Sequence, residues 1–63
     1  MTEERKEKIV ELDSLLQFLG DYADEAWELA FRGYYKEALN KLRKVEEVLS
    51  KAIPLAEELA RGE

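Results

Sequence analysis

The chain has 63 residues, enough for one small domain, of which 46% are hydrophobic and 40% charged. It contains neither Cys nor His, which excludes disulfides, thiolate metal sites and histidine-based catalysis. The net charge is −5, and no apolar run approaches the roughly 20 residues that a membrane-spanning helix requires. We therefore expect residues 1–63 to form one soluble, cytoplasmic domain.

The first half of the chain predicts one long helix over about residues 3–32. Thr2 can cap its N-terminus, and apolar residues then recur at alternating spacings of three and four, which is the heptad pattern of positions a and d. Gly20-Asp21 could instead end one helix and cap another, which would give a three-helix bundle. Because the heptad phase continues unchanged through Gly20, we favour one continuous helix.

Gly33 is the strongest stop signal in the chain and marks a predicted turn. The heptad pattern resumes after it and predicts a second helix over about residues 34–61. Pro54 lies within this helix at the outward position f, where a bend is tolerated, so we expect a bend and not an end. The predicted fold is all-α, a long antiparallel helical hairpin.

Both predicted helices carry an apolar stripe that covers about three of every seven positions. A lone hairpin covers only part of each stripe, so we expect two copies to pair into a homodimeric four-helix bundle. The residues predicted to form the self-association core occupy positions a and d: Ile9, Leu12, Leu16, Leu19, Ala23, Ala26, Ala30, Tyr35, Ala38, Leu42, Val45, Leu49, Ala52, Ala56 and Leu59.

Charge is unevenly distributed along the chain. Residues 9–31 contain six acidic and no basic side chains, whereas residues 32–44 contain five basic and one acidic. A hairpin turn at Gly33 brings these segments together, so their opposite charges are expected to attract each other. Four carboxylates share one outward helix face without a Glu-x-x-His motif, which favours a solvated surface over a metal site. These four are Asp21, Asp24, Glu25 and Glu28.

Two other surfaces are candidates for binding a partner. Basic side chains along one outward face of the second helix could contact the phosphate backbone of a nucleic acid, although the surrounding chain is acidic. These residues are Lys36, Arg43 and Lys44, with Arg32 nearby. Large aromatic residues outside the a and d positions could form a protein-binding patch. These residues are Phe18, Phe31 and Tyr34.

Catalysis finds no support in the sequence. Ser14 and Ser50 have no base arranged near them, and the chain has no Gly-rich phosphate-binding loop. A core this small also leaves little room for a substrate pocket. We expect neither an enzymatic activity nor a cofactor.

Around the turn, the chain resembles the helical hairpins of tetratricopeptide repeats. The family's order of small residue, turn glycine, aromatic, alanine and apolar residue is matched by Ala26, Gly33, Tyr35, Ala38 and Leu42. The resemblance covers about residues 22–42 and implies a helical hairpin with a protein-binding role. Val45 and Ser50 stand where the family usually has Ala and Pro, and both helices are about twice as long as those of a 34-residue repeat.

In length and architecture, the chain is also similar to the Rop family of plasmid RNA-regulating dimers, whose hairpins pair into four-helix bundles. This is a similarity of shape without a shared motif. The abundance of Glu, Lys and Arg is typical of thermophile proteins and of designed helical sequences alike.

Three interpretations follow from the sequence. We favour a non-enzymatic, self-associating protein that serves as an interaction or scaffold module. The alternatives are a Rop-like nucleic-acid-binding regulator and a designed bundle without a biological function. Gly20 and Pro54 weigh against idealised design, which avoids such residues inside helices.

Overall fold

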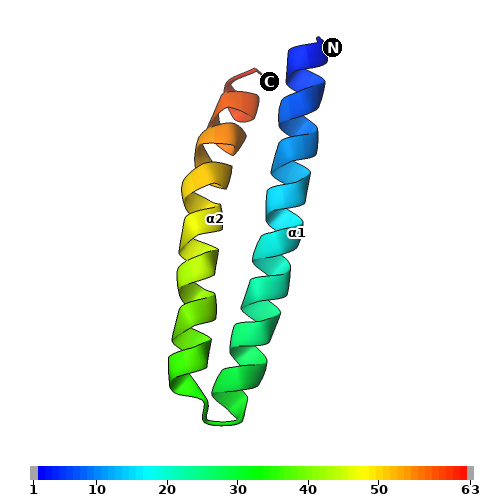
Figure 1. Ribbon diagram of the computed structural model, residues 1–63. Coiled ribbons are helices and arrows are strands. Elements are labelled where there is room, and N and C mark those ends of the chain that lie inside the picture. The colour runs from blue at the N-terminus through cyan, green and yellow to red at the C-terminus, as the bar shows by residue number, and fades with distance from the viewer. Residues whose placement is uncertain (1, 63) are drawn as a thin grey trace.

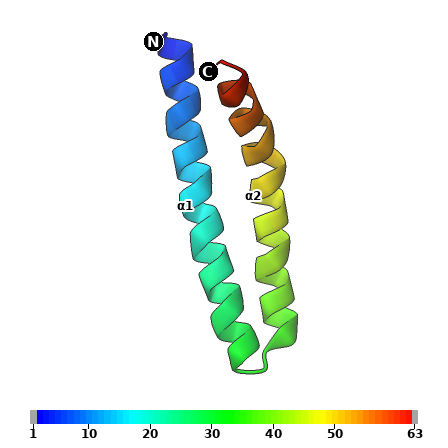
Figure 2. The same ribbon diagram turned by 180° about the vertical axis from the view of Figure 1, so that it is seen from behind.

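The computed structural model describes residues 2–62, which form two long helices, α1 (Glu3–Phe31) and α2 (Tyr35–Arg61). The helices lie side by side and antiparallel, so the start of α1 and the end of α2 meet at one end (Figures 1 and 2). The hairpin is a rod with extents of 46 × 14 × 14 Å. The predicted all-α hairpin is confirmed.

Helix α1 begins and continues as its sequence predicts. The Thr2 side chain accepts a hydrogen bond of 3.1 Å from the Arg5 main-chain N–H, which satisfies a donor that the first turn would leave unpaired. The helix then runs through Gly20 and Asp21 without interruption. The alternative three-helix arrangement is therefore wrong. The physical reason is that the apolar phase is the same before and after Gly20, so a single helix keeps its apolar side on α2.

The turn at Gly33 has the hydrogen bonds of a Schellman motif. The Gly33 N–H donates to the Ala30 carbonyl at 3.0 Å, and the Tyr34 N–H donates to the Leu29 carbonyl at 2.8 Å. Gly33 has a φ of 87°, the left-handed conformation that glycine adopts without steric cost. The predicted stop at Gly33 is confirmed, with the helix ends each one residue farther from it than expected.

Pro54 lies inside α2, which continues past it to Arg61. Proline has no N–H and cannot donate to the carbonyl of Ser50, one turn earlier. Its side chain is exposed, so neither helix has to move aside for the ring. As expected, Pro54 does not end the helix.

The two helices meet along a seam of residues at heptad positions d and g. On α1 these are Leu12, Leu15, Leu19, Tyr22, Ala26 and Leu29, and on α2 they are Ala38, Lys41, Val45, Val48, Ala52, Leu55 and Leu59. Within residues 2–62, four hydrophobic side chains are buried, and three of them are alanines. They are Ala26, Ala38, Val48 and Ala52. Small side chains let the helix axes approach closely, but they contribute little apolar area to the core.

Candidate interaction surface

A continuous apolar surface remains outside the seam, formed by heptad position a of both helices. We call it the apolar face, and it consists of Ile9, Leu16, Ala23 and Ala30 of α1 and Tyr35, Leu42, Leu49 and Ala56 of α2. All are exposed except Ala30, which is half-buried. Leu16 and Leu42 keep about half of their surface in contact with solvent, at 51% and 50%, and Tyr35 keeps 71%.

The position-a residues of both helices lie on the same side of the hairpin. In each helix, position a is next to position d, on the side of the seam away from position g. The two antiparallel helices lie in one plane. A half-turn about an axis perpendicular to that plane places each helix on the other and leaves each side of the hairpin on the same side, so position a of both helices lies on one side. The eight residues therefore form one surface that follows the whole rod.

Large apolar side chains also flank the apolar face. Trp27, Leu39 and Ile53 occupy position e, next to position a, and Val10 and Phe31 occupy the outermost position b. We call these five residues the apolar flanks. All are exposed, Trp27 at 68% and Phe31 at 80%, and the Trp27 and Phe31 rings stack with their centroids 5.6 Å apart.

We call the opposite side of the hairpin the polar face; it includes Phe18, Glu25, Lys41 and Lys44. Ion pairs connect the two helices on this side. Lys41 Nζ lies 3.1 Å from the carboxylate of Glu25, which joins the basic segment of α2 to the acidic segment of α1 as expected. Lys41 Nζ also lies 5.8 Å from the centroid of the Tyr22 ring, within range of a cation–π interaction. The polar face therefore has charged groups that bind one another, whereas the apolar face has only hydrophobic groups.

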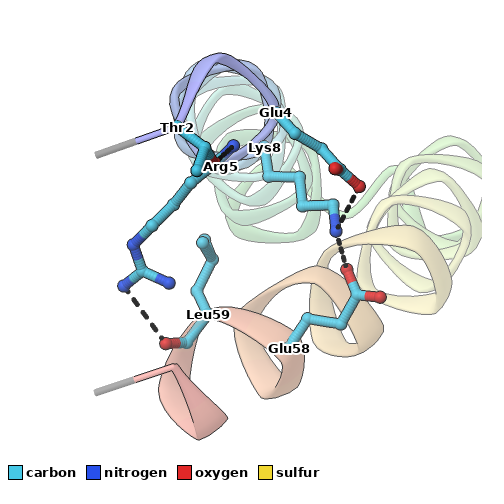
Figure 3. Close-up of a pocket in the computed structure, with 6 residues that line it drawn as sticks. All are labelled: Thr2, Glu4, Arg5, Lys8, Glu58 and Leu59. Atoms are coloured by element: carbon cyan, nitrogen blue, oxygen red, sulfur yellow. Dashed lines mark hydrogen bonds and ion pairs between the residues drawn. The ribbon is translucent and has the colours of Figure 1, made fainter.

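At the end of the hairpin opposite the turn, polar contacts join the two helices, as Figure 3 shows. Lys8 Nζ lies 3.0 Å from Glu58 and 3.5 Å from Glu4, and the Arg5 guanidinium donates a 3.4 Å hydrogen bond to the Leu59 carbonyl. The hydrogen bond to Glu58 raises the pKa of Lys8. These residues line a shallow hollow, and their contacts join the helices, which is a structural role.

The structure divides the predicted self-association core into two surfaces. Its position-d members lie in the seam of the hairpin: Leu12, Leu19, Ala26, Ala38, Val45, Ala52 and Leu59. Its position-a members form the apolar face. The second row of the seam comes from position g, which the heptad pattern indicated only as a flank of the stripe. A signal was present in α1, because position g holds the larger residues Leu15, Tyr22 and Leu29.

The structure does not bring the three residues of the predicted aromatic patch together. Phe18 lies midway along α1 on the polar face, where its ring stacks on Tyr22 with the centroids 6.5 Å apart. Phe31 ends α1, and Tyr34 follows it in the turn. Phe31 instead shares its surroundings with Trp27, so it belongs with the apolar flanks.

The predicted basic residues are all exposed but do not share one row of side chains. Lys36 and Arg43 are seven residues apart and follow one edge of α2. Lys44 points toward the polar face, where its Nζ lies 3.8 Å from Glu47, and Arg32 caps the end of α1. Among residues 2–62 no group of His, Cys, Asp or Glu side chains could hold a metal ion.

No protein-family model, curated protein or solved structure matches the chain. Neither of the two helices in the described part of the chain is long and apolar enough to cross a membrane.

Proposed function

We propose that this protein is a non-enzymatic, self-associating helical module that pairs through its apolar face into a homodimeric four-helix bundle. The observation that carries this proposal is the continuous row of exposed hydrophobic side chains along both helices. A second copy offers the same row, and packing two such rows together removes both from water. In this role the dimer is an interaction or scaffold unit.

The surface area of the hairpin supports this proposal. Its accessible surface is 5128 Å², whereas a compact monomer of 7.3 kDa exposes about 4,200 Å². The excess of roughly 900 Å² is similar to the ~800 Å² that each partner buries in a standard interface.

The test is a pair of substitutions that each place a carboxylate at a half-exposed hydrophobic position. Leu42→Glu changes the apolar face, and Phe18→Glu changes the polar face at a residue of similar exposure. In sedimentation equilibrium at micromolar concentration, we expect the unaltered chain and Phe18→Glu to be dimers. We expect Leu42→Glu to dissociate at least tenfold more readily, because burying an unpaired charge is strongly unfavourable. A compact monomer for the unaltered chain would contradict the proposal.

A further inference from the structure

We infer that the two hairpins pair with both turns at the same end, so that α1 of each copy lies beside α2 of the other. This inference rests on the proposed dimerisation and adds the orientation of the two copies. Two exposed patches carry it, one on the outer edge of each helix. The α1 patch consists of Asp24, Trp27 and Phe31, and the α2 patch consists of Lys36, Leu39 and Arg43.

Both patches border the apolar face but lie on opposite edges of the hairpin. Trp27 and Leu39 occupy position e, and the other four residues occupy position b, which points away from the neighbouring helix of the same chain. The two patches therefore cannot contact each other within one hairpin. All six side chains are exposed. Among residues 2–62, Asp24, Lys36 and Arg43 form no ion pair, so their charges are available to a second copy.

The ion pairs between the helices show which residues of α1 and α2 are level along the rod. Lys8 pairs with Glu58 and Glu25 pairs with Lys41, and both pairs of residue numbers add up to 66. A residue of α1 is therefore level with the residue of α2 whose number completes this sum. By this measure the two patches lie at the same level, near the turn.

A two-fold axis parallel to the helices brings the patches of two copies together, because rotation about it keeps every residue at its own level. The α1 patch of each copy then faces the α2 patch of the other. The facing pairs, each within one residue of level, are Trp27 with Leu39, Asp24 with Arg43, and Phe31 with Lys36. They provide an apolar contact, an ion pair and a cation–π contact.

The charges of the neighbouring segments favour the same arrangement. Residues 21–31 of α1 contain four acidic and no basic side chains, whereas residues 35–45 of α2, which are level with them, contain four basic and one acidic. Pairing α1 with α2 of the second copy places these segments side by side. Opposite charges across an interface favour one orientation over another.

The alternative two-fold axis, perpendicular to the helices, places each helix beside its own counterpart. The acidic residues 9–31 of α1 then lie along the same acidic segment of the second copy. Trp27 lies level with Ser14, next to Asp13, and Glu46 meets the same residue of the second copy. Like charges that face each other are unfavourable, and the large Trp27 side chain lacks an apolar partner.

The inferred orientation has a cost at the open end. Ile53 lies level with Asp13 of the second copy, and Val10 lies next to its Glu57. The alternative would pair Val10 with Phe31 and would relieve this exposure. The contacts of the α1 and α2 patches offset the cost, because Trp27 buries more apolar surface than Val10 and its neighbours there are oppositely charged.

Exchange of two charges tests the contact between Asp24 and Arg43. Asp24→Arg places two guanidinium groups together and Arg43→Asp places two carboxylates together. We expect each to raise the dimer dissociation constant about tenfold in sedimentation equilibrium. The double variant restores opposite charges, and its dissociation constant should return to within about twofold of that of the unaltered chain. Because the two residues lie on opposite edges of one hairpin, this recovery requires contact between copies.

Lys36 and Glu57 provide the matched control for this exchange. They are level with each other only if each helix lies beside its own counterpart. In the inferred dimer, the effects of Lys36→Glu and Glu57→Lys should therefore simply add. A recovery of affinity in this double variant, with none for Asp24 and Arg43, would overturn the inferred orientation.

A nitroxide label at Glu3→Cys measures the orientation directly, since the chain has no Cys of its own. In the inferred dimer both labels lie at one end of a bundle whose helices are about 8–10 Å apart, within about 30 Å of each other. In the alternative dimer they lie at opposite ends, about 50 Å apart at about 1.5 Å per residue. If the unaltered chain sediments as a monomer, the proposed dimerisation itself fails. A dimer with a label distance near 50 Å overturns only the orientation.

Discussion

Gly33 is the residue on which the hairpin turn depends, because its φ of 87° is unfavourable for any residue with a Cβ. We expect Gly33→Ala to lower the free energy of unfolding by about 1 kcal/mol, as left-handed strain exceeds the entropy that alanine removes from the unfolded chain. Urea denaturation followed by circular dichroism measures this change. An added Cβ would meet nothing within 4 Å, so the effect isolates backbone strain from steric contact.

Gly20 provides the matched control for this substitution. A Cβ added at Gly20 would also meet open space, but Gly20 lies inside α1 with helical dihedral angles. We expect Gly20→Ala to raise the free energy of unfolding by up to about 1 kcal/mol, because alanine is the better helix former. Equal effects of the two substitutions would show that Gly33 does not need its left-handed conformation.

The seam between the two helices depends on small side chains at its centre. Ala52 retains 3% of its surface and faces α1, so a larger residue has no space unless the helices separate. We expect Ala52→Leu to lower the free energy of unfolding by about 1–3 kcal/mol through overpacking. Ala60→Leu is the control, because Ala60 is exposed on the same helix and its substitution should change stability by less than about 0.5 kcal/mol. If both variants unfold at the same urea concentration, the seam is not packed closely at Ala52.

The helices and the turn were predictable from the sequence because their signals are local. Thr2, the heptad spacing and Gly33 each act within a few residues of their own position. The unbroken passage through Gly20 followed from the constant apolar phase on its two sides. These features predicted the hairpin without knowledge of how its helices pack.

The division between seam and apolar face was not predictable in the same way. Each helix has hydrophobic residues at positions a, d and g, and any two adjacent rows could face the other helix. The two rows that face the other helix are selected by how the side chains of both helices pack together. The ion pair between Lys41 and Glu25 across the seam is part of that packing. The heptad pattern specifies the width of the stripe, whereas the packing of one helix on the other selects the part that remains exposed.

At the scale of the whole molecule, the hairpin buries too little to be strongly stable alone. Three of its four buried hydrophobic residues are alanines, and within the described chain no side chain is completely shielded from solvent. A chain of this size has a marginal core even when it is compact. In the proposed dimer the apolar face adds to stability, because the second copy covers it.

The proposed dimerisation couples folding to association, and it predicts that the thermal midpoint depends on protein concentration. Each tenfold dilution weakens a dimer by about 1.4 kcal/mol relative to unfolded chains. We expect the midpoint, followed by circular dichroism at 222 nm, to fall by several degrees for each tenfold dilution between 100 and 1 μM. In Leu42→Glu, which is expected to weaken the dimer, the midpoint should be lower than that of the unaltered chain at every concentration. A midpoint of the unaltered chain that stays constant over this range would mean that the hairpin is stable without a second copy.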